Sequence, residues 1–277
     1  MSLSGKENEI AKLKNENIRL KMKVNMAKGT SDQLRVQREK FESISKILSK
    51  YLSPQIHEQI FSGEEDAIVK SKRKKLTVFF SDIVGFTSIS DQVESEDLTN
   101  ILNFYLNEMS EIAIKFGGTI DKFIGDGMMI FFGDPKSEGI EKDAKNCIQM
   151  AVEMQKRMKE LEDVWGKKFG LKERLSIRIG INTGFCTVGN FGSEQRIDYT
   201  AMGAQVNLAS RLEGLSKPGS IVISEETYLL VKSMYDFLEP IEINAKGFLR
   251  KIKYFEINME KSSEMHFSNI SGLGYEV

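Results

Sequence analysis

The sequence contains 277 residues, of which 40% are hydrophobic and 29% charged, as is typical of a globular domain that carries an extension. Its 39 basic and 40 acidic residues give a net charge of -1 at pH 7, which excludes a global attraction to nucleic acid or to an anionic membrane. Two cysteines cannot form a disulfide framework, and no apolar run reaches the roughly 18 residues of a membrane span. We therefore expect a cytoplasmic protein, or the cytosolic part of a larger one.

Apolar residues recur at seven-residue intervals along the N-terminal region. One seam position is occupied by Leu13, Leu20, Ala27, Leu34, Phe41 and Leu48. This repeat predicts a parallel, two-stranded coiled coil over residues 1–52. Asn17 in the alternate seam position supports the prediction, because a buried amide that pairs with its copy fixes the register. The alternative is a single amphipathic helix packed on its own domain. The packed stripe shifts after Gly29, which would suit a helix that relays a signal from an upstream sensor domain.

A transducer linker is predicted over residues 53–74. Pro54 ends the helical pattern, a polar loop follows at 62–66, and the basic run from Lys70 to Lys75 is interpreted as a solvated edge. The globular catalytic domain is expected at 75–258. No strong pattern continues into the tail at 259–277, whose role stays open.

Apolar periodicity predicts five elements or element pairs at the start of this domain. They are a buried strand at 76–80, a helix over 98–116, a strand hairpin at 119–124 and 128–132, a helix over 144–161 and a strand at 175–182. The order β-α-β-β-α-β predicts an α+β fold with a ferredoxin-like core. The expected additions are a strand at 186–189, a loop as far as 199, a helix at 206–215 and closing strands up to 257. The glycines between 180 and 192 are interpreted as turns.

Two aspartates are the candidate metal ligands. Asp82 ends an otherwise apolar strand, where burial of an unpaired carboxylate would cost free energy. Asp126 lies in the hairpin turn of the same small sheet. They can converge on one cation, because Mg²⁺ and Mn²⁺ prefer oxygen ligands and bind through one or two carboxylates plus substrate phosphates. Taken alone, each residue has a structural alternative, since Asp-Gly is a common turn pair and an aspartate can cap a helix.

Two further features suit phosphate chemistry. The turn Gly85-Phe86-Thr87 follows Asp82 and offers backbone amides that can cradle phosphate oxygens, whereas the P-loop motif Gly-x-x-x-x-Gly-Lys-Ser/Thr is absent. Asn207 and Arg211 are four residues apart and share one face of the 206–215 helix. An arginine beside a reacting phosphate stabilises its developing charge. The alternative is a surface face paired with nearby acids.

Three sequence blocks then carry a family resemblance. They are FSDIVGFT from Phe80, KFIGDG from Lys122 and GAQVNLASRL from Gly203. In this order and spacing they resemble the signature blocks of class III nucleotidyl cyclases over roughly residues 76–257. The resemblance implies an enzyme that cyclises a nucleoside triphosphate and releases pyrophosphate.

The resemblance implies a role for each matching position. Asp82, Asp126 and the Ile83 carbonyl would bind two Mg²⁺ or Mn²⁺ ions per active site. Asn207 would orient the ribose, and Arg211 would stabilise the transition state at the α-phosphate. The residues implied to bind the nucleotide are Phe86, Thr87, Lys122, Thr200 and Lys246.

The base is implied to be read by Lys122 and Thr200. Adenylyl members carry lysine at the first position, where a cationic donor suits the adenine N1 acceptor. Many carry aspartate at the second, but a threonine-bearing branch is also adenylyl-specific, and threonine offers an acceptor to the adenine amine. The implied activity is therefore conversion of ATP to 3′,5′-cyclic AMP. The alternatives are a guanylyl cyclase, a catalytically silent dimeric module, and another ferredoxin-like palm enzyme such as a diguanylate cyclase.

The family also implies a homodimer of head-to-tail catalytic domains. Metal ligands from one protomer would complete a site with the base-reading and transition-state residues of the other. The predicted parallel coiled coil supports dimerisation independently, because it would hold two copies together.

Overall fold

The computed structural model describes residues 3–62, 71–193, 195–244 and 251–259. The chain divides into two compact units, Met1–Leu52 and Ser53–Val277. Within the described residues, no helix is both long enough and apolar enough to cross a membrane.

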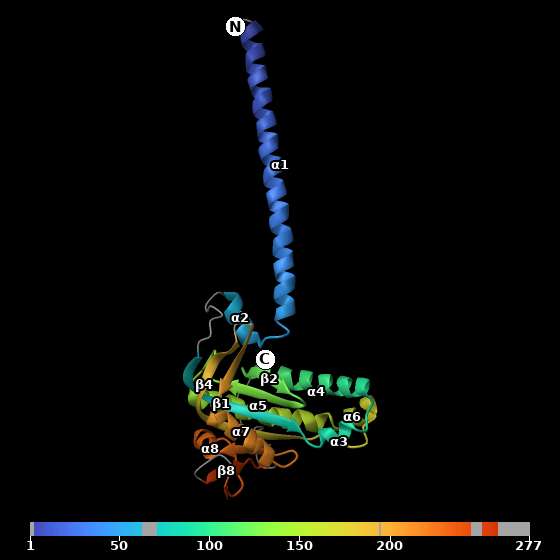
Figure 1. Ribbon diagram of the computed structural model, residues 1–277, viewed down its shortest axis with the longest axis vertical. Coiled ribbons are helices and arrows are strands. Elements are labelled where there is room, and N and C mark those ends of the chain that lie inside the picture. Colours follow the sequence, from blue (N-terminus) through green and yellow to red (C-terminus); the bar gives the residue numbers. More distant parts are fainter. Residues whose placement is uncertain (1–2, 63–70, 194, 245–250, 260–277) are drawn as a thin grey trace, which may run out of the picture. The chain divides into compact units, whose positions relative to one another are not determined.

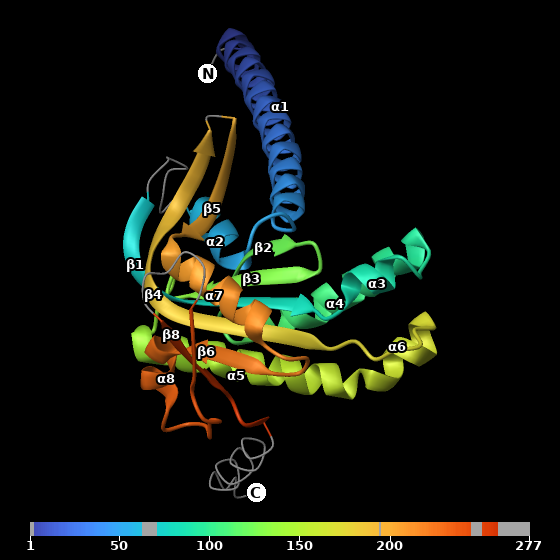
Figure 2. The same ribbon diagram turned by 60° about the horizontal axis from the view of Figure 1, so that its bottom comes forward.

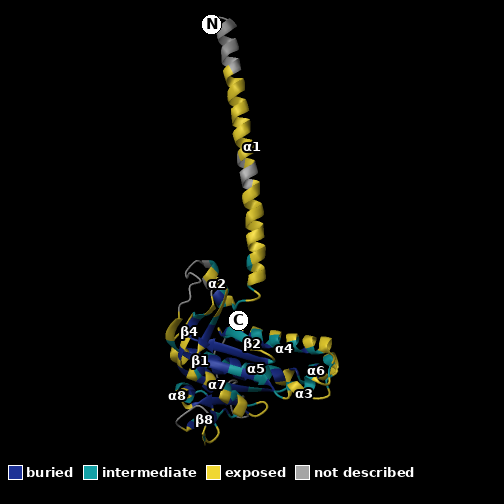
Figure 3. Ribbon diagram, in the orientation of Figure 1, coloured by how far each residue is buried: buried dark blue, intermediate teal, exposed yellow. Residues whose placement is uncertain are grey.

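The first unit is a single helix, α1 (Leu3–Leu48), drawn in blue in Figure 1. Figure 3 shows that it is exposed along most of its described length. The apolar side chains predicted to form a seam follow this pattern, with exposed fractions of 60% for Leu13, 57% for Leu20 and 61% for Phe41. One chain therefore presents the row of apolar side chains that a second helix would bury, and the pairing of two helices stays a prediction.

The second unit begins with a short helix, α2 (Pro54–Ser62). Ile56 is buried, and Gln55 Nε2 donates a hydrogen bond of 3.0 Å to the carbonyl oxygen of Gly118. An exposed ion pair of 2.6 Å joins Glu58 to Lys136. The segment predicted as a linker therefore contains a helix that is packed on the rest of the second unit.

Eight described strands form one sheet. They are β1 (Ser71–Ile83), β2 (Thr119–Ile124), β3 (Gly127–Phe132), β4 (Ile177–Ser193), β5 (Arg196–Met202), β6 (Ile221–Ser224), β7 (Ile241–Ile243) and β8 (Ile252–Glu256). The order across the sheet is β2-β3-β1-β4-β6-β8-β7, and β5 pairs with the C-terminal half of β4. The β4–β6 pair is parallel, while the other pairs between named strands are antiparallel.

The remaining helices connect these strands. They are α3 (Phe86–Ser90), α4 (Ser95–Lys115), α5 (Ile140–Glu160), α6 (Glu162–Phe169), α7 (Ala204–Leu215) and α8 (Glu225–Val231). From β1 to β4 the chain follows the order strand, helix, strand, strand, helix, strand that the sequence predicts. The short helices α3, α6 and α8 were not among the predicted elements, because five to eight residues are too few for a helical period to stand out.

The sheet has a hydrophobic core on each face, and β1 contributes to both. Phe79 and Ile83 pack into the larger core with α4 and α5, while Leu76 and Val78 pack into a second core with α7. This alternation follows from the two-residue period of a strand. Figure 2 shows α5 and α7 on opposite sides of β4.

Two predictions about strand lengths were wrong. Residues 71–75 of the basic run before Leu76 belong to β1, whose backbone ladder with β4 extends as far as the pair Ser71 and Gly189. The strand predicted at 186–189 and the loop predicted after it are parts of one hairpin, formed by β4 and β5. Main-chain hydrogen bonds to a long partner strand hold these polar segments extended, which side-chain periodicity cannot reveal.

The interpretation of the glycines between 180 and 192 as turns was also wrong, since Gly180, Gly184, Gly189 and Gly192 all lie inside β4. A Cβ atom at Gly180 would collide with the backbone nitrogen of Glu213 in α7, and one at Gly184 would lie 2.6 Å from the side chain of Gln205. Both glycines therefore allow α7 to pack closely on the strand. The same helix carries the predicted site residues Asn207 and Arg211.

Candidate active site

The two candidate metal ligands lie close together at one end of the paired strands β1 and β3. Asp82 is near the end of β1, and Asp126 lies in the two-residue loop of the β2–β3 hairpin. The backbone N–H of Ile83 donates a 3.0 Å hydrogen bond to Asp126 Oδ2, which fixes this carboxylate beside β1. At Gly125 a positive φ of 64° favours glycine, so the tight turn that places Asp126 is specified locally.

The negative charges of Asp82 and Asp126 repel each other. Burial, and then the hydrogen bond and negative charge of Asp82, raise the pKa of Asp126 to about 6. A divalent cation would relieve this repulsion, so the donor set fits a hard metal ion. Within the described residues, no group of three or more His, Cys, Asp or Glu side chains could hold a metal ion. Two carboxylates therefore fit the mode in which substrate phosphates and water complete the coordination.

An arginine that the sequence analysis missed also contacts Asp82. Arg178 of β4 lies opposite Asp82 in the sheet and donates from Nη2 to Asp82 Oδ2 at 2.7 Å. Its Nε forms an ion pair of 2.6 Å with Glu213 Oε1 of α7. A signal for this network existed, because a lone arginine between Ile177 and Ile179 in a half-buried strand needs a counter-charge.

The predicted phosphate-binding turn is the start of a short helix. Gly85 has a φ of 73° and precedes α3, so Phe86 and Thr87 are its first two residues. Phe86 is half-buried and packs against the larger core, whereas Thr87 is exposed. The amides of a first helical turn have no acceptor within the helix and can bind a ligand.

The two predicted base-reading residues lie together in one chain. Lys122 of β2 donates from Nζ to the hydroxyl oxygen of Thr200 in β5 at 3.2 Å. Asp121, which the sequence analysis did not select, contacts both of them. Its Oδ2 accepts a hydrogen bond of 2.6 Å from the Thr200 hydroxyl, and its Oδ1 lies 3.1 Å from Lys122 Nζ. Burial raises the pKa of Asp121, while the hydrogen bond from Thr200 and the charge of Lys122 act in the opposite direction.

Asn207 and Arg211 lie on the exposed face of α7. Among the described residues, neither side chain has a hydrogen bond or ion pair. The start of this helix is held by Asn182 of β4, whose Nδ2 donates to the Gln205 carbonyl at 2.8 Å. Glu213, on the same helix, pairs with Arg178 rather than with Arg211. Lys246 lies outside the described residues.

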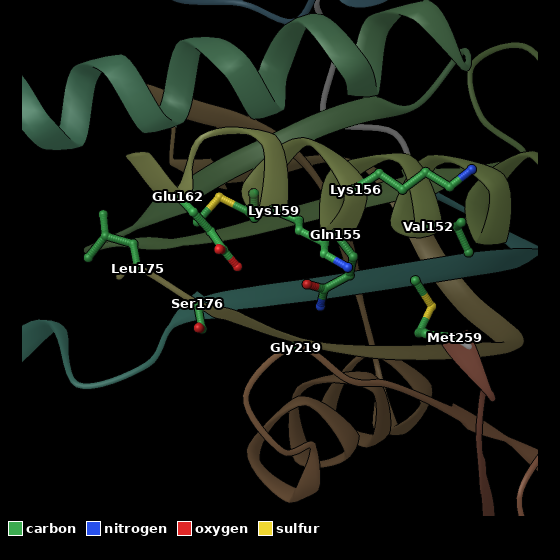
Figure 4. A pocket seen from close by; sticks show the side chains of 10 residues that line it. Val152, Gln155, Lys156, Lys159, Glu162, Leu175, Ser176, Gly219 and Met259 are labelled. Atoms are coloured by element: carbon green, nitrogen blue, oxygen red, sulfur yellow. The ribbon is translucent and has the colours of Figure 1, made fainter. Parts of the chain in front are cut away.

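The structure thus brings the predicted residues together in separate groups. One group contains Asp82, Ile83 and Asp126, and another contains Lys122 and Thr200. A cavity of about 490 Å³ lies between α5 and the chain before β4 (Figure 4). Gln155, Lys156 and Ser176 are among its lining residues, and none of the predicted site residues lines it.

Comparison with known proteins decides the family. Residues 68–259 match the family described as the adenylate and guanylate cyclase catalytic domain. The chain belongs to this family. The match covers the whole region in which the sequence blocks resemble class III cyclases, and it includes every residue of the groups described above.

Individual relatives include both adenylyl and guanylyl cyclases. The crystal structure of the adenylyl cyclase CyaB from P. aeruginosa is 53% identical, covers 68% of this chain and 96% of that one, and has a TM-score of 0.66. The guanylyl cyclase Cya2 is 35% identical, with a TM-score of 0.64 and coverage of 68% and 93%. Adenylate cyclase 1 of Rhizobium meliloti is 32% identical over 67% of this chain. The matched region spans 28% of the length of that relative.

Proposed function

We propose that this cyclase domain is an adenylyl cyclase that converts ATP to 3′,5′-cyclic AMP and pyrophosphate. The observation that carries the base assignment is the contact between Lys122 and Thr200. The ammonium of Lys122 can only donate, and adenine N1 is an acceptor, whereas the guanine N1–H is a donor. The similarity to an adenylyl cyclase structure at 53% identity supports the same choice.

In the proposed reaction the ribose 3′-oxygen attacks the α-phosphorus, its proton is released, and the bond from that phosphorus to the leaving pyrophosphate oxygen breaks. Asp82, Asp126 and the Ile83 carbonyl would hold two Mg²⁺ or Mn²⁺ ions, which would lower the charge on the attacking and leaving oxygens. The first amides of α3, at Phe86 and Thr87, would donate to the triphosphate. Asn207 would orient the ribose.

Arg211 would stabilise the charge that develops at the α-phosphate, and Lys246 would hold the terminal phosphates. The exposed side chain of Arg211 supports this role. Among the described residues it has no hydrogen bond or ion pair that would have to break before it binds a phosphate. Among the described residues, the carboxylates of Asp82 and Asp126 have no hydrogen bond or ion pair with Asn207 or Arg211, which further supports a site shared between two protomers. In a head-to-tail homodimer, metal ligands from one chain would face Arg211 of the partner subunit.

The function is tested by incubating the purified protein with ATP or GTP and Mn²⁺ or Mg²⁺, followed by chromatography of the products. We expect cyclic AMP and pyrophosphate from ATP at a kcat/KM at least about tenfold above that for GTP. Cyclic GMP as the main product would overturn the base assignment. A protein that forms neither cyclic nucleotide would be a silent module.

We also propose that residues 1–52 form a parallel coiled coil that raises the local concentration of catalytic domains, with residues 53–74 relaying a signal from an upstream domain. The exposed apolar row of α1 supports the pairing. A chain without residues 1–52 should then need a higher protein concentration, by about tenfold or more, to reach half-maximal specific activity. A dilution series of both chains measures this, and identical curves would contradict the proposal.

A further inference from the structure

We infer that Asp121 determines the purine preference of this domain by holding the Thr200 hydroxyl so that it can only accept a hydrogen bond from the base. The inference rests on the proposed adenylyl cyclase activity. It assigns to Asp121 a positioning role, since its contacts are with the two base-reading side chains rather than with the base.

The geometry places Asp121 behind the base-reading pair. Its side chain is fully buried, and its two oxygens are used separately. Oδ2 accepts from the Thr200 hydroxyl at 2.6 Å and from the backbone N–H of Ala201 at 3.2 Å. Oδ1 lies 3.1 Å from the ammonium of Lys122. One buried carboxylate therefore links β2 to β5 at the point where the base is read.

The hydrogen-bonding capacity of Thr200 shows why this link matters. A hydroxyl has one proton to donate and two lone pairs. The proton is directed to Asp121, because an ionised carboxylate can only accept and a hydrogen bond to it is stronger than a neutral one. One lone pair accepts from Lys122 at 3.2 Å. What remains for a ligand is a single acceptor.

The same count applies to Lys122. Its ammonium has three donors. One donates to the Thr200 hydroxyl oxygen, and the charge of the ammonium is paired with Asp121 Oδ1 at 3.1 Å, so a donor remains for a ligand. Lys122 therefore offers a donor to the base, and Thr200 beside it offers an acceptor. Without Asp121, the Thr200 hydroxyl could either donate or accept.

This remaining pattern matches adenine and opposes guanine. Adenine presents an acceptor at N1 and a donor at its 6-amino group, while guanine presents a donor at N1 and an acceptor at O6. With the Thr200 proton held by Asp121, guanine would place acceptor against acceptor at position 6 and donor against donor at N1. A site built to pair with such groups rejects an analogue that leaves them unpaired.

Asp121→Asn tests the inference. An amide has an N–H₂ group in place of one oxygen, so every orientation sets donors against either Lys122 or the Thr200 and Ala201 groups. One of the two base-facing residues then loses its anchor. We expect the ratio of kcat/KM for ATP to that for GTP to fall at least about tenfold, a change that a purely structural role would not produce.

A double variant provides the rescue. In Asp121→Asn with Thr200→Asp, the carboxylate moves from position 121 to position 200, so the formal charge is unchanged. Aspartate at 200 is an acceptor without help, and it can accept from the asparagine amide. We therefore expect the double variant to recover the preference for ATP. Asp143→Asn is the matched control, because Asp143 is also a buried carboxylate that accepts two hydrogen bonds, but from Ser137 and Glu138. Its ATP to GTP ratio should stay at the wild-type value.

The outcomes separate the inference from the function on which it rests. If the wild type does not prefer ATP, the proposed function fails. If the wild type prefers ATP and Asp121→Asn keeps the ratio, only the role of Asp121 is overturned. Should Asp121→Asn not fold, the wild type is assayed with purine riboside triphosphate, which lacks the 6-amino group. A kcat/KM about tenfold below that for ATP supports Thr200 as an obligatory acceptor, and equal use of both nucleotides refutes it.

Discussion

Replacing Asp126 with asparagine should abolish cyclase activity and leave the metal-free protein at least as stable as the wild type. Activity should fall by on the order of 10³-fold or more, because one of two carboxylate ligands for the catalytic metal ions is lost. Stability should rise, because the pKa of Asp126 is raised to about 6 by burial and by Asp82, and a neutral amide removes this repulsion. Most inactivating substitutions of buried groups have the opposite effect on stability.

The pH dependence of the stability difference follows from the same shift. Since the pKa of Asp126 is raised from 3.8 to about 6, this group stabilises the fold below its unfolded pKa and loses that contribution as the pH rises through about 6. The Tm of the Asp126→Asn variant should therefore exceed that of the wild type by more at about pH 7.5 than at about pH 5, by roughly 2 °C.

Thermal unfolding at both pH values, with and without Mn²⁺, measures this effect. Mn²⁺ should raise the Tm of the wild type alone, because the ion relieves the repulsion only where both carboxylates are present. Asp163→Asn is a suitable control, since Asp163 is an exposed aspartate in an ion pair with Lys167. It should change neither activity nor the response to Mn²⁺. An active Asp126→Asn variant would show that the metal site lies elsewhere.

Replacing Arg211 with alanine should lower kcat by about 10²- to 10³-fold, because the charge that would stabilise the transition state is removed. The Tm should stay within about 1 °C of the wild type, since Arg211 is exposed and has no partner among the described residues. Steady-state kinetics and thermal unfolding together distinguish this loss from misfolding. A loss of activity that tracks a lower Tm would contradict the catalytic role.

The same variant tests whether each site is shared between two chains. A mixture of inactive Arg211→Ala and inactive Asp126→Asn chains should regain about a quarter of the wild-type specific activity. With random exchange, half of the dimers are mixed, and each mixed dimer has one site with neither substitution. Mixing Asp126→Asn with Asp82→Asn should restore nothing, because both changes affect the same half of every site. Equal recovery in the two mixtures, or recovery in neither, would argue against a head-to-tail composite site.

Local signals in the sequence were sufficient for much of the candidate site. The Gly125-Asp126 turn is specified by Gly125, and the apolar strand before Asp82 by its own side chains. The helical spacing of Asn207 and Arg211 likewise put both on one face of α7. Each of these features depends on residues that are close in the chain, which is why sequence patterns could predict them.

The contacts of Asp121 and Arg178 depend on residues far away in the chain. Asp121 is 79 residues from Thr200, and Arg178 is 96 residues from Asp82. Their positions follow from strand pairing, which no local pattern encodes. The length of β4 was underestimated for the same reason, because its polar end is held by hydrogen bonds to β1 and β5.

The sequence by itself thus determined the family, the order of the main elements and the two carboxylates that could bind a metal ion. Tertiary structure alone decided that Asp126 is held against Asp82 with a raised pKa, and that Arg178 supplies the counter-charge. It also decided that Asp121 holds Lys122 and Thr200. The physical reason is that a pKa and the direction of a hydroxyl proton depend on which groups are neighbours in space, and pairing across the sheet sets those neighbours.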